Sequence, residues 1–351
     1  MRRRMLASVA NGGRLRKMEA RDQETARANQ QSLIDLQSLH SKPTPEEVAY
    51  ILAAHWPIWK GHPGRTMLWL KALTQAGRGD ICAALVLLCQ QHNLEVNTFH
   101  FNVALGACLK QSLWSTATAL LEEMIDSEVP LDTSSYNCWL NLLARTQTST
   151  AVLQLLREMT RNGQEPDSIS FNTAIAACDR ESQWEQAISI FANMKRTAVK
   201  RSTVTYNSLL SACGKGWLWL DALRLLEEME ARGGGARGSP PDVVSYNSAI
   251  VACGRGGVWQ SALDCLTRMA RQRLQRTMVT YGAVISACER EGRWEAAVTL
   301  LRESAQSKLR PDTIAANATI SACEKGSSWQ FGLLLLLEEL PMLSVASDMV
   351  S

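Results

Sequence analysis

TVTYNSLLSACGKGWLWLDALRLLEEM, residues 203–229, is the stretch that decides the fold, because its features return along the chain at a fixed interval. Cys213 has counterparts in the same register at Cys108, Cys178, Cys253, Cys288 and Cys323. Trp219 has counterparts at Trp114, Trp184, Trp259, Trp294 and Trp329. In both series the successive steps are 70, 35, 40, 35 and 35 residues. A period of this size indicates a solenoid, in which each repeat packs only against its neighbours.

Each repeat reads as a hairpin of two helices. The first segment carries apolar residues at helical spacing, as in Tyr281, Val284, Ile285 and Cys288. A second segment runs from the tryptophan to a methionine, and Pro-Asp closes several repeats. The pattern predicts an all-α, right-handed α-solenoid of helix-turn-helix repeats. We expect its tryptophan and methionine columns to be core.

Seven repeats are expected in residues 98–351, and they occupy 98–132, 133–167, 168–202, 203–242, 243–277, 278–312 and 313–347. The fourth is longer by five residues, and the excess lies in Ala231–Ser239, which we interpret as a loop after its second helix. Residues 41–97 are expected to form an N-terminal cap, with one helix at Glu46–His55, and a degenerate repeat from Pro63. Residues 1–40 are interpreted as a basic leader, either an organelle transit peptide or a basic tail.

Composition argues against several classes of protein. The formal net charge is +3, but residues 1–30 hold eight Lys or Arg against three acids, so the remainder carries +3 − 5 = −2. A strongly basic body, which would by itself indicate nucleic-acid binding, is therefore lacking. The ten cysteines include no Cys-x-x-Cys, and we expect buried, reduced thiols. We expect no metal site, no cofactor, no catalytic site and no membrane span, since no run approaches about 18 apolar residues.

The fifth position of the repeats is asparagine in six of seven cases: Asn102, Asn137, Asn172, Asn207, Asn247, Gly282 and Asn317. Asparagine is a poor helix former that offers both a donor and an acceptor, so this column suggests contacts to bases. The alternative is helix capping. The last position reads Asp132, Asp167, Ser202, Asp242, Thr277 and Asp312. These residues could cap the next helix, contact a base, or do both.

Position thirteen holds a cation in every repeat: Lys110, Arg145, Arg180, Lys215, Arg255, Arg290 and Lys325. One cation per repeat suits phosphates spaced along a single strand. The alternative is a favourable charge at a helix C-terminus, worth about 0.3–1 kcal/mol. Such a preference would tolerate exceptions, and this column has none.

The motifs V-T-Y-N-S-L-L at a repeat start, L-L-E-E-M in its second helix and Pro-Asp at its end resemble those of pentatricopeptide repeat proteins of the P type, arrays of 35-residue repeats. The resemblance covers residues 98 to about 340. It implies sequence-specific binding of single-stranded RNA in an organelle, with one base per repeat. It also implies action by occupancy or by recruiting an RNA-processing enzyme in trans. The alternative is a protein–protein scaffold of the tetratricopeptide kind.

In the family, the fifth and last residues together select a base, and an apolar second residue lets the base stack between repeats. The corresponding apolar residues here are Phe99, Ile169, Val204, Val244, Val279 and Ile314. Asn with Asp favours U in the family, and Asn with Ser favours C. The resemblance therefore implies the target U-U-C-U-pyrimidine-purine-pyrimidine, read from 5′ to 3′ along the array.

Overall fold

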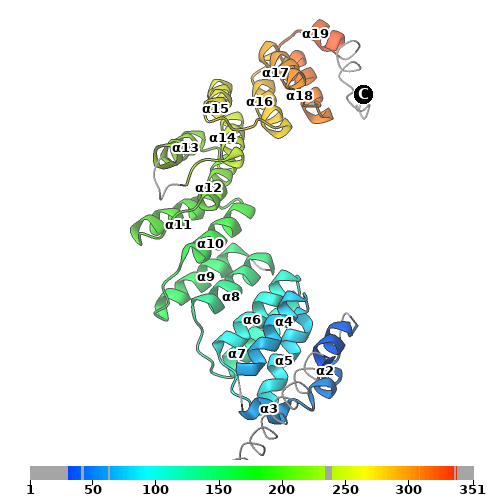
Figure 1. Ribbon diagram of the computed structural model, residues 1–351. Helices are drawn as coiled ribbons and strands as arrows, with labels where there is room; N and C mark the ends of the chain where they lie inside the picture. The colour runs from blue at the N-terminus through cyan, green and yellow to red at the C-terminus, as the bar shows by residue number, and fades with distance from the viewer. Residues whose placement is uncertain are drawn as a thin grey trace, which may run out of the picture. The chain divides into compact units, whose positions relative to one another are not determined.

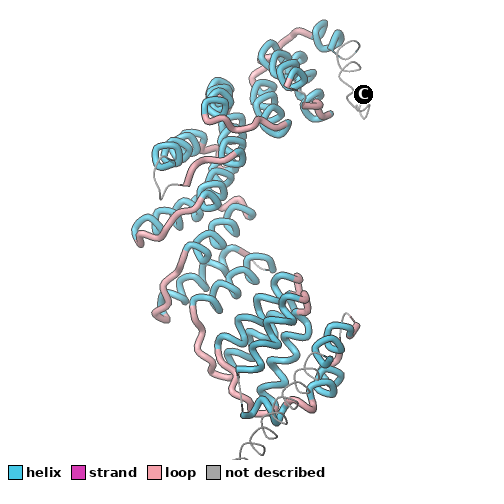
Figure 2. Tube along the Cα trace, in the orientation of Figure 1, coloured by secondary structure: helices cyan, strands magenta, loops and turns pink. Residues whose placement is uncertain are grey.

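Helices account for all the regular secondary structure in the described part of the chain. The computed structural model describes residues 31–40, 43–61, 64–146, 148–233, 239–307, 309–335 and 337. Among these residues it has the helices α2 to α19 and no strand (Figures 1 and 2). The all-α fold class predicted from the repeat period is confirmed, and residues 1–30 of the leader predicted at residues 1–40 lie outside the described residues.

The first helices of the repeats begin at the residues that the sequence register predicts. They are α6 (Thr98–Lys110), α8 (Thr133–Thr146), α10 (Ser168–Arg180), α12 (Thr203–Lys215), α14 (Val243–Arg255), α16 (Met278–Arg290) and α18 (Thr313–Lys325). The second helices are α7 (Trp114–Asp126), α9 (Ser149–Arg161), α11 (Trp184–Arg196), α13 (Trp219–Gly233), α15 (Trp259–Arg271), α17 (Trp294–Gln306) and α19 (Trp329–Leu334). α13 extends into the insertion of repeat four, and residues 234–238 lie outside the described part.

Local sequence explains where the first helices start and stop. The last residue of the preceding repeat is the N-cap, and its side chain accepts a backbone N–H of the helix, as Asp167 does for α10 and Ser202 for α12. Two residues after the helix, the chain turns at a residue whose φ is positive, in the left-handed region. This residue is Ser112, Ser182, Trp217, Gly257, Gly292 or Ser327, depending on the repeat.

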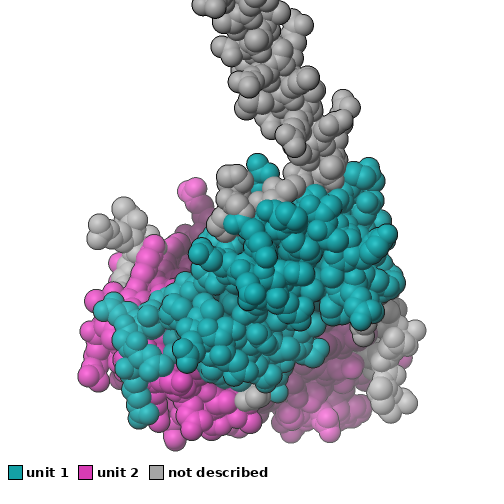
Figure 3. Space-filling view, turned by 90° about the horizontal axis from the view of Figure 1, so that it is seen from below, with its two compact units in different colours: residues 1–146, 161–165 teal, residues 147–160, 166–351 magenta. Residues whose placement is uncertain are grey.

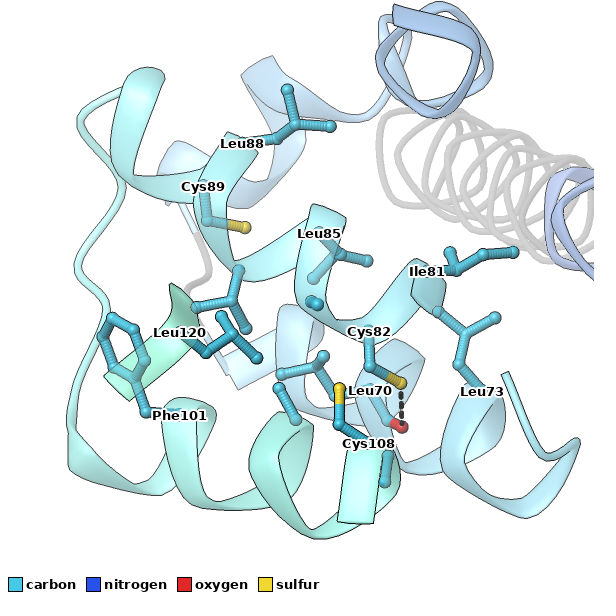
Figure 4. Close-up of a cluster of buried hydrophobic side chains, with 14 of the residues drawn as sticks. Leu70, Leu73, Ile81, Cys82, Leu85, Leu88, Cys89, Phe101, Cys108 and Leu120 are labelled. Atoms are coloured by element: carbon cyan, nitrogen blue, oxygen red, sulfur yellow. Dashed lines mark hydrogen bonds between the residues drawn. The ribbon is translucent and has the colours of Figure 1, made fainter. Parts of the chain in front are cut away.

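The chain divides into two units, residues 1–146 with 161–165 and residues 147–160 with 166–351 (Figure 3). In the first unit, α4 (Gly64–Gln75) and α5 (Gly79–Gln91) form a hairpin that packs against α6. Figure 4 shows its core, where the Cys82 and Cys108 thiols lie near Leu70, and Phe101 lies beside Leu120. Residues 64–91 thus form a hairpin of the same layout as the repeats that follow.

In the second unit, each first helix packs against the next first helix, from α10 through α12, α14 and α16 to α18. The aromatic residue at position four of the repeats is buried, as at Phe171, Tyr206, Tyr246 and Tyr281. The methionines of the second helices are also fully buried, at Met159, Met194, Met229 and Met269. The methionine column is therefore core, as expected.

The tryptophan column differs from this expectation. Its members are only partly buried, and Trp329 is 66% exposed. Their position explains this, because each lies at the first residue of the second helix, beside the turn that follows the first helix of the next repeat. At Gly256 an added Cβ would lie 2.4 Å from the Trp219 ring, and at Gly216 it would lie 2.6 Å from Trp184. The tryptophans therefore pack between repeats at the rim rather than in the interior.

The N-terminal cap also differs from the sequence prediction. The expected helix at Glu46–His55 is present as α2 (Pro45–Leu52), which ends three residues earlier, and a further short helix that the sequence did not predict, α3 (Trp56–Gly61), follows it. Pro57 explains the break, because in a continuous helix it could not donate to the carbonyl of Ala53 and its ring would clash there.

Residues 31–38, which the sequence groups with the leader, are helical, and Leu36 is fully buried. The Arg78 guanidinium donates to the carbonyls of Gln37, Leu39 and His40 at 2.9 Å each. It thereby provides hydrogen bonds to the backbone carbonyls at the C-terminal end of this helix. Residues 31–40 therefore belong with the cap and not with the leader.

Candidate nucleic-acid interface

The asparagines of position five lie in the second turn of the first helices. Asn102, Asn137, Asn172, Asn207 and Asn247 are partly buried, and Asn317 is exposed. None of them caps its own helix, because the N-caps of α6, α10, α12, α14 and α18 are other residues. Helix capping therefore does not explain the asparagine column. Gly282, the exception in the column, leaves open space, since an added Cβ would meet nothing within 4 Å.

The residues at the last position do cap helices. Asp167, Ser202, Asp242, Thr277 and Asp312 are the N-caps of α10, α12, α14, α16 and α18. Asp132 accepts the Ser135 N–H at 2.7 Å at the start of α8. The capping role that the sequence left as an alternative is therefore present in each case. It does not exclude a second role, because a carboxylate has four acceptor sites.

In three repeats the structure joins the fifth and last residues by a direct hydrogen bond. The amide nitrogen of Asn102 donates to Asp132 at 2.9 Å, and that of Asn207 donates to Asp242 at 3.1 Å. In repeat three, Asn172 donates to the Ser202 hydroxyl at 3.4 Å. An amide nitrogen has two N–H donors. Within the described residues the second one has no partner in these three repeats, so it is available to a ligand.

The other repeats differ. In repeat five the carboxamide oxygen of Asn247 is buried without a partner among the described residues, and the Thr277 hydroxyl contacts Thr280 instead. Repeat six has no side chain at Gly282, and the closing residue expected for Asn317 lies outside the described part of the chain. Asn137 lies in α8, which belongs to the first unit, whereas Asp167 is the N-cap of α10 and belongs to the second unit.

The carboxylates of Asp132 and Asp242 remain ionised in this setting. Burial opposes their ionisation, but hydrogen bonds from a backbone N–H, from the asparagine and from a serine hydroxyl outweigh it and lower the pKa of each. Each carboxylate is thus held as a pure acceptor at neutral pH, whereas the Ser202 hydroxyl in the same place can also donate.

The apolar residues of position two are exposed, although apolar side chains usually gain from burial. Their exposed fractions range from 54% for Phe99 to 71% for Ile314. Ile169, Val204, Val244 and Val279 lie between these values. In repeat two this position is Ser134, which is polar. A column of exposed apolar side chains at one position of successive helices favours a function in binding over a function in packing.

The cation column of position thirteen is less uniform than its sequence. Lys215 forms an ion pair with Asp179 of the preceding repeat at 3.1 Å, and Lys325 forms one with Glu289 at 2.8 Å. Arg255 donates to the Gly214 carbonyl, and Arg145 lies over the Trp114 ring. Within the described part of the chain, Lys110 and Arg290 make no hydrogen bond or ion pair. Because a paired cation must give up its partner to bind a phosphate, these two are the most available members.

One column of the interface escaped the sequence analysis, the hydroxyl at position three of repeats two to six. It comprises Ser135, Ser170, Thr205, Ser245 and Thr280, all of them fully buried. Ser135, Thr205 and Ser245 donate to the carboxamide oxygen of the asparagine in the preceding repeat. The signal was present in the sequence, since a small hydroxyl residue recurs at this position five times.

The ten cysteines are free thiols, and nine of them are buried. Burial raises the pKa of Cys82 and of Cys89 to about 12, so neither is a reactive thiolate at neutral pH. The described residues contain no cluster of His, Cys, Asp and Glu suited to a metal ion. None of the described helices is long and apolar enough to cross a membrane.

The repeated hairpins and their registered columns define a class of protein, an α-solenoid built from helix-turn-helix repeats. Three family models match the chain. The PPR repeat family matches residues 166–215, and the PPR repeat matches 99–129, 204–234 and 279–308. The pentatricopeptide repeat domain matches 119–181 and 224–291. Together the matches cover residues 99–308, which is more than half of the chain. The chain belongs to the pentatricopeptide repeat family.

A solved structure agrees with this fold. The chain is 26% identical to the pentatricopeptide repeat protein PPR10 from maize, with a TM-score of 0.58, and the match covers 89% of this chain and 45% of that one. The chain thus spans less than half the length of the maize protein. PPR10 in complex with an 18-nt psaJ RNA element is 19% identical, with a TM-score of 0.44 and coverages of 86% and 52%.

A third similar structure is the PPR domain of Arabidopsis thaliana protein-only RNase P 1 in complex with tRNA. It is 15% identical, with a TM-score of 0.40 and coverages of 50% of this chain and 89% of that one. No curated protein matches the chain in sequence.

Proposed function

We propose that this protein binds single-stranded RNA by sequence, with one base held by each repeat. Family membership and the columns of positions two, five and thirteen support this function. The observation that carries it is the recurring pair of a fifth and a last residue, joined at 2.9 Å in repeat one and at 3.1 Å in repeat four. Each such pair leaves one amide N–H and part of a carboxylate for a ligand.

The chemistry of these pairs fits pyrimidines. Uracil offers an N3–H donor between two carbonyl acceptors, so its carbonyl accepts the remaining N–H of Asn207 while its N3–H donates to the Asp242 carboxylate. Cytosine has an acceptor at N3 instead, and an ionised carboxylate would repel it. The Ser202 hydroxyl can donate to that nitrogen, which favours cytosine in repeat three. Repeats one, two and four are therefore proposed to select U, and repeat three C.

The base preferences of repeats five, six and seven are proposed from their fifth residues and, in repeat five, also from its last residue. Gly282 leaves open space in repeat six, which suits a larger purine. Asn247 with Thr277 in repeat five, and Asn317 in repeat seven, are proposed to bind pyrimidines. The exposed apolar residues of position two would pack against the bases, and at the aromatic Phe99 such stacking is worth about 1–3 kcal/mol. The cations of position thirteen would contact the phosphates.

Such a protein would act in organelle RNA metabolism by occupying a transcript. Bound protein shields RNA from nucleases, keeps it unfolded, or recruits an RNA-processing enzyme in trans. The basic composition of residues 1–17, six Lys or Arg with no acid, supports delivery to an organelle.

The test is selection of binders from a random RNA pool with the full chain. We expect enrichment of U-U-C-U-pyrimidine-purine-pyrimidine, with the third position C. Ser202→Asp should move only the third base from C toward U, because Asp keeps the helix cap but presents no donor. The other six positions serve as the internal control. Failure to enrich any RNA would favour the protein–protein scaffold. If the preferred third base is the same in Ser202→Asp as in the unsubstituted chain, these pairs do not select bases.

A further inference from the structure

The asparagine of each reading pair also contacts the first helix of the next repeat. The hydroxyl of Ser135 donates to the carboxamide oxygen of Asn102 at 2.7 Å. Thr205 donates to Asn172 at 2.6 Å, and Ser245 donates to Asn207 at 2.5 Å. Each of these bonds is shorter than the bond from the same asparagine to the last residue of its repeat, and all three donors are fully buried.

The backbone fixes the direction in which these hydroxyls donate. A hydroxyl has one proton, and in repeat three the Thr205 oxygen accepts the Ser202 N–H at 3.0 Å. Ser245 accepts the Asp242 N–H at 3.2 Å in the same way. In Thr205 the proton then points toward Asn172. The Ser135 and Ser245 hydroxyls each also lie 2.9 Å from the carboxylate of the last residue, which shares their proton with the asparagine. The capping boxes of α12 and α14 thus also orient a donor toward the preceding repeat.

A carboxamide has two orientations that differ by exchanging its oxygen and its nitrogen. The hydroxyl requires the oxygen on its side, and the last residue of the repeat therefore faces the nitrogen. Where the last residue is Asp, the carboxylate enforces the same choice, because it repels the amide oxygen. In repeat three the last residue is Ser202, whose hydroxyl accepts either orientation. Among the described residues, Thr205 is then the only group that fixes the orientation of the Asn172 carboxamide.

We propose that the third-position hydroxyls of Ser135, Thr205 and Ser245 are positioning residues for base selection, so that each of these reading units is a triad drawn from two repeats. This inference rests on the proposed function. It makes Thr205 the strongest case, since without its hydroxyl Asn172 could offer the base either a donor or an acceptor. Ser135 and Ser245 do the same for Asn102 and Asn207, with support from Asp132 and Asp242.

Thr280 provides a matched control. Its hydroxyl accepts the Thr277 N–H at 3.2 Å and contacts the Thr277 hydroxyl at 3.1 Å. Thr205 makes the same two contacts with Ser202, at 3.0 and 3.1 Å. Only Thr205 makes the additional bond to an asparagine, because the Asn247 oxygen is buried without a partner among the described residues. If the hydroxyl only capped its helix, Thr205 and Thr280 would therefore have the same role.

The experiment compares Thr205→Val, Thr205→Ser, Thr280→Val and Asn172→Ala in the full chain. Binding is measured to the heptamer UUCUUGU and to its variant with U at the third base, and the readout is the ratio of the two Kd values. Losing one hydrogen bond should lower this ratio roughly three- to tenfold in Thr205→Val. Thr205→Ser should restore it, and Thr280→Val should leave it unchanged. Thermal melts should show similar losses of stability for the two valine variants.

The outcomes separate the inference from the function on which it rests. If Asn172→Ala removes the discrimination while Thr205→Val keeps it, the hydroxyl is only a helix cap and the inference is overturned. If Thr280→Val lowers the ratio as much as Thr205→Val, the effect is one of stability and the inference is again overturned. If Asn172→Ala itself leaves the ratio unchanged, base reading by the proposed function fails.

Discussion

At the scale of single residues, Asp242 links the stability of α14 to pH. Its hydrogen bonds lower its pKa, so the folded state binds this proton more weakly than the unfolded chain does. The contribution of such a group is present above the unfolded pKa of about 3.9 and is lost as pH falls through the lowered folded pKa. We expect the free energy of unfolding, measured by denaturant titration, to fall as pH is lowered from about 4.

Asp242→Ser provides the control for this pH dependence, because serine keeps the helix cap but does not titrate. The fall at low pH should be smaller in this variant than in the unsubstituted chain. An equal fall in both would mean that other carboxylates carry the acid sensitivity.

Arg78 is a second residue whose role can be tested alone. It pairs with Asp80 at 2.8 Å while donating to the end of helix 31–38. Arg78→Ala should weaken the attachment of residues 31–40 by on the order of 2 kcal/mol, since hydrogen bonds to charged groups are worth about 1.5–3 kcal/mol. Limited proteolysis with mass spectrometry should then show faster cleavage within residues 31–40. Arg65→Ala, at an exposed arginine, should not change the cleavage rate.

At the scale of elements, the contact between the tryptophan of one repeat and the turn of the next should tolerate substitution of the turn glycine poorly. Gly256 ends α14 with φ −75°, so glycine is needed there for close approach and not for its backbone freedom. Gly256→Ala would place a Cβ 2.4 Å from Trp219 and should cost about 1–3 kcal/mol by overpacking. Thermal or chemical unfolding measures this cost.

Gly106→Ala is the matched control within a first helix, because nothing lies within 4 Å of its added Cβ. It should be neutral or stabilising by up to about 1 kcal/mol, the usual gain for alanine over glycine in a helix. Equal losses in the two variants would mean that the Trp219 contact is not the cause.

The elements were the most predictable part of the molecule. A fixed period placed every first helix to the residue, because the N-cap, the apolar spacing and the turn recur together. The tryptophans were misjudged, since periodicity shows that a residue is constrained but not whether it packs inside or at the rim. The helix expected at Glu46–His55 is present but ends at Leu52, and α3 was not predicted because it lies outside the period.

At the scale of the whole molecule, RNA binding should weaken with salt because bound cations displace counterions. For single strands the slope of log K against log salt is about −0.7 per neutralised phosphate, so several contacts give roughly −2 to −5. Replacing the two unpaired cations Lys110 and Arg290 with Ala should reduce this slope by about 1.4. The measurement is a series of binding isotherms at increasing salt.

The paired cations provide the comparison. Replacing Lys215 and Lys325 with Ala should reduce the slope less, because their ion pairs with Asp179 and Glu289 already offset their charge. A larger change in this pair than in Lys110 and Arg290 would contradict the assignment of available cations.

Part of the candidate site could be read from the sequence. The columns at positions two, five and thirteen follow from the register alone, and the exposure of the apolar column agrees with that reading. The sequence could not show that Lys215 is paired or that Asn102 contacts Ser135, because both contacts join different repeats. Such contacts depend on how neighbouring hairpins are offset, and a period in one dimension does not contain that offset.

The capping residue at the end of each repeat has a consequence for how arrays of this kind can be recombined. By count Asp242 closes repeat four, but by its bonds it begins α14 and acts together with Ser245. A chimaera joined at the 35-residue boundary would separate the selecting pair from the helix that supports it. Joined between positions three and five of a first helix, for example at Tyr246, it would keep Asn207, Asp242 and Ser245 in one block. Productive exchange between such genes should therefore cross over between these two positions.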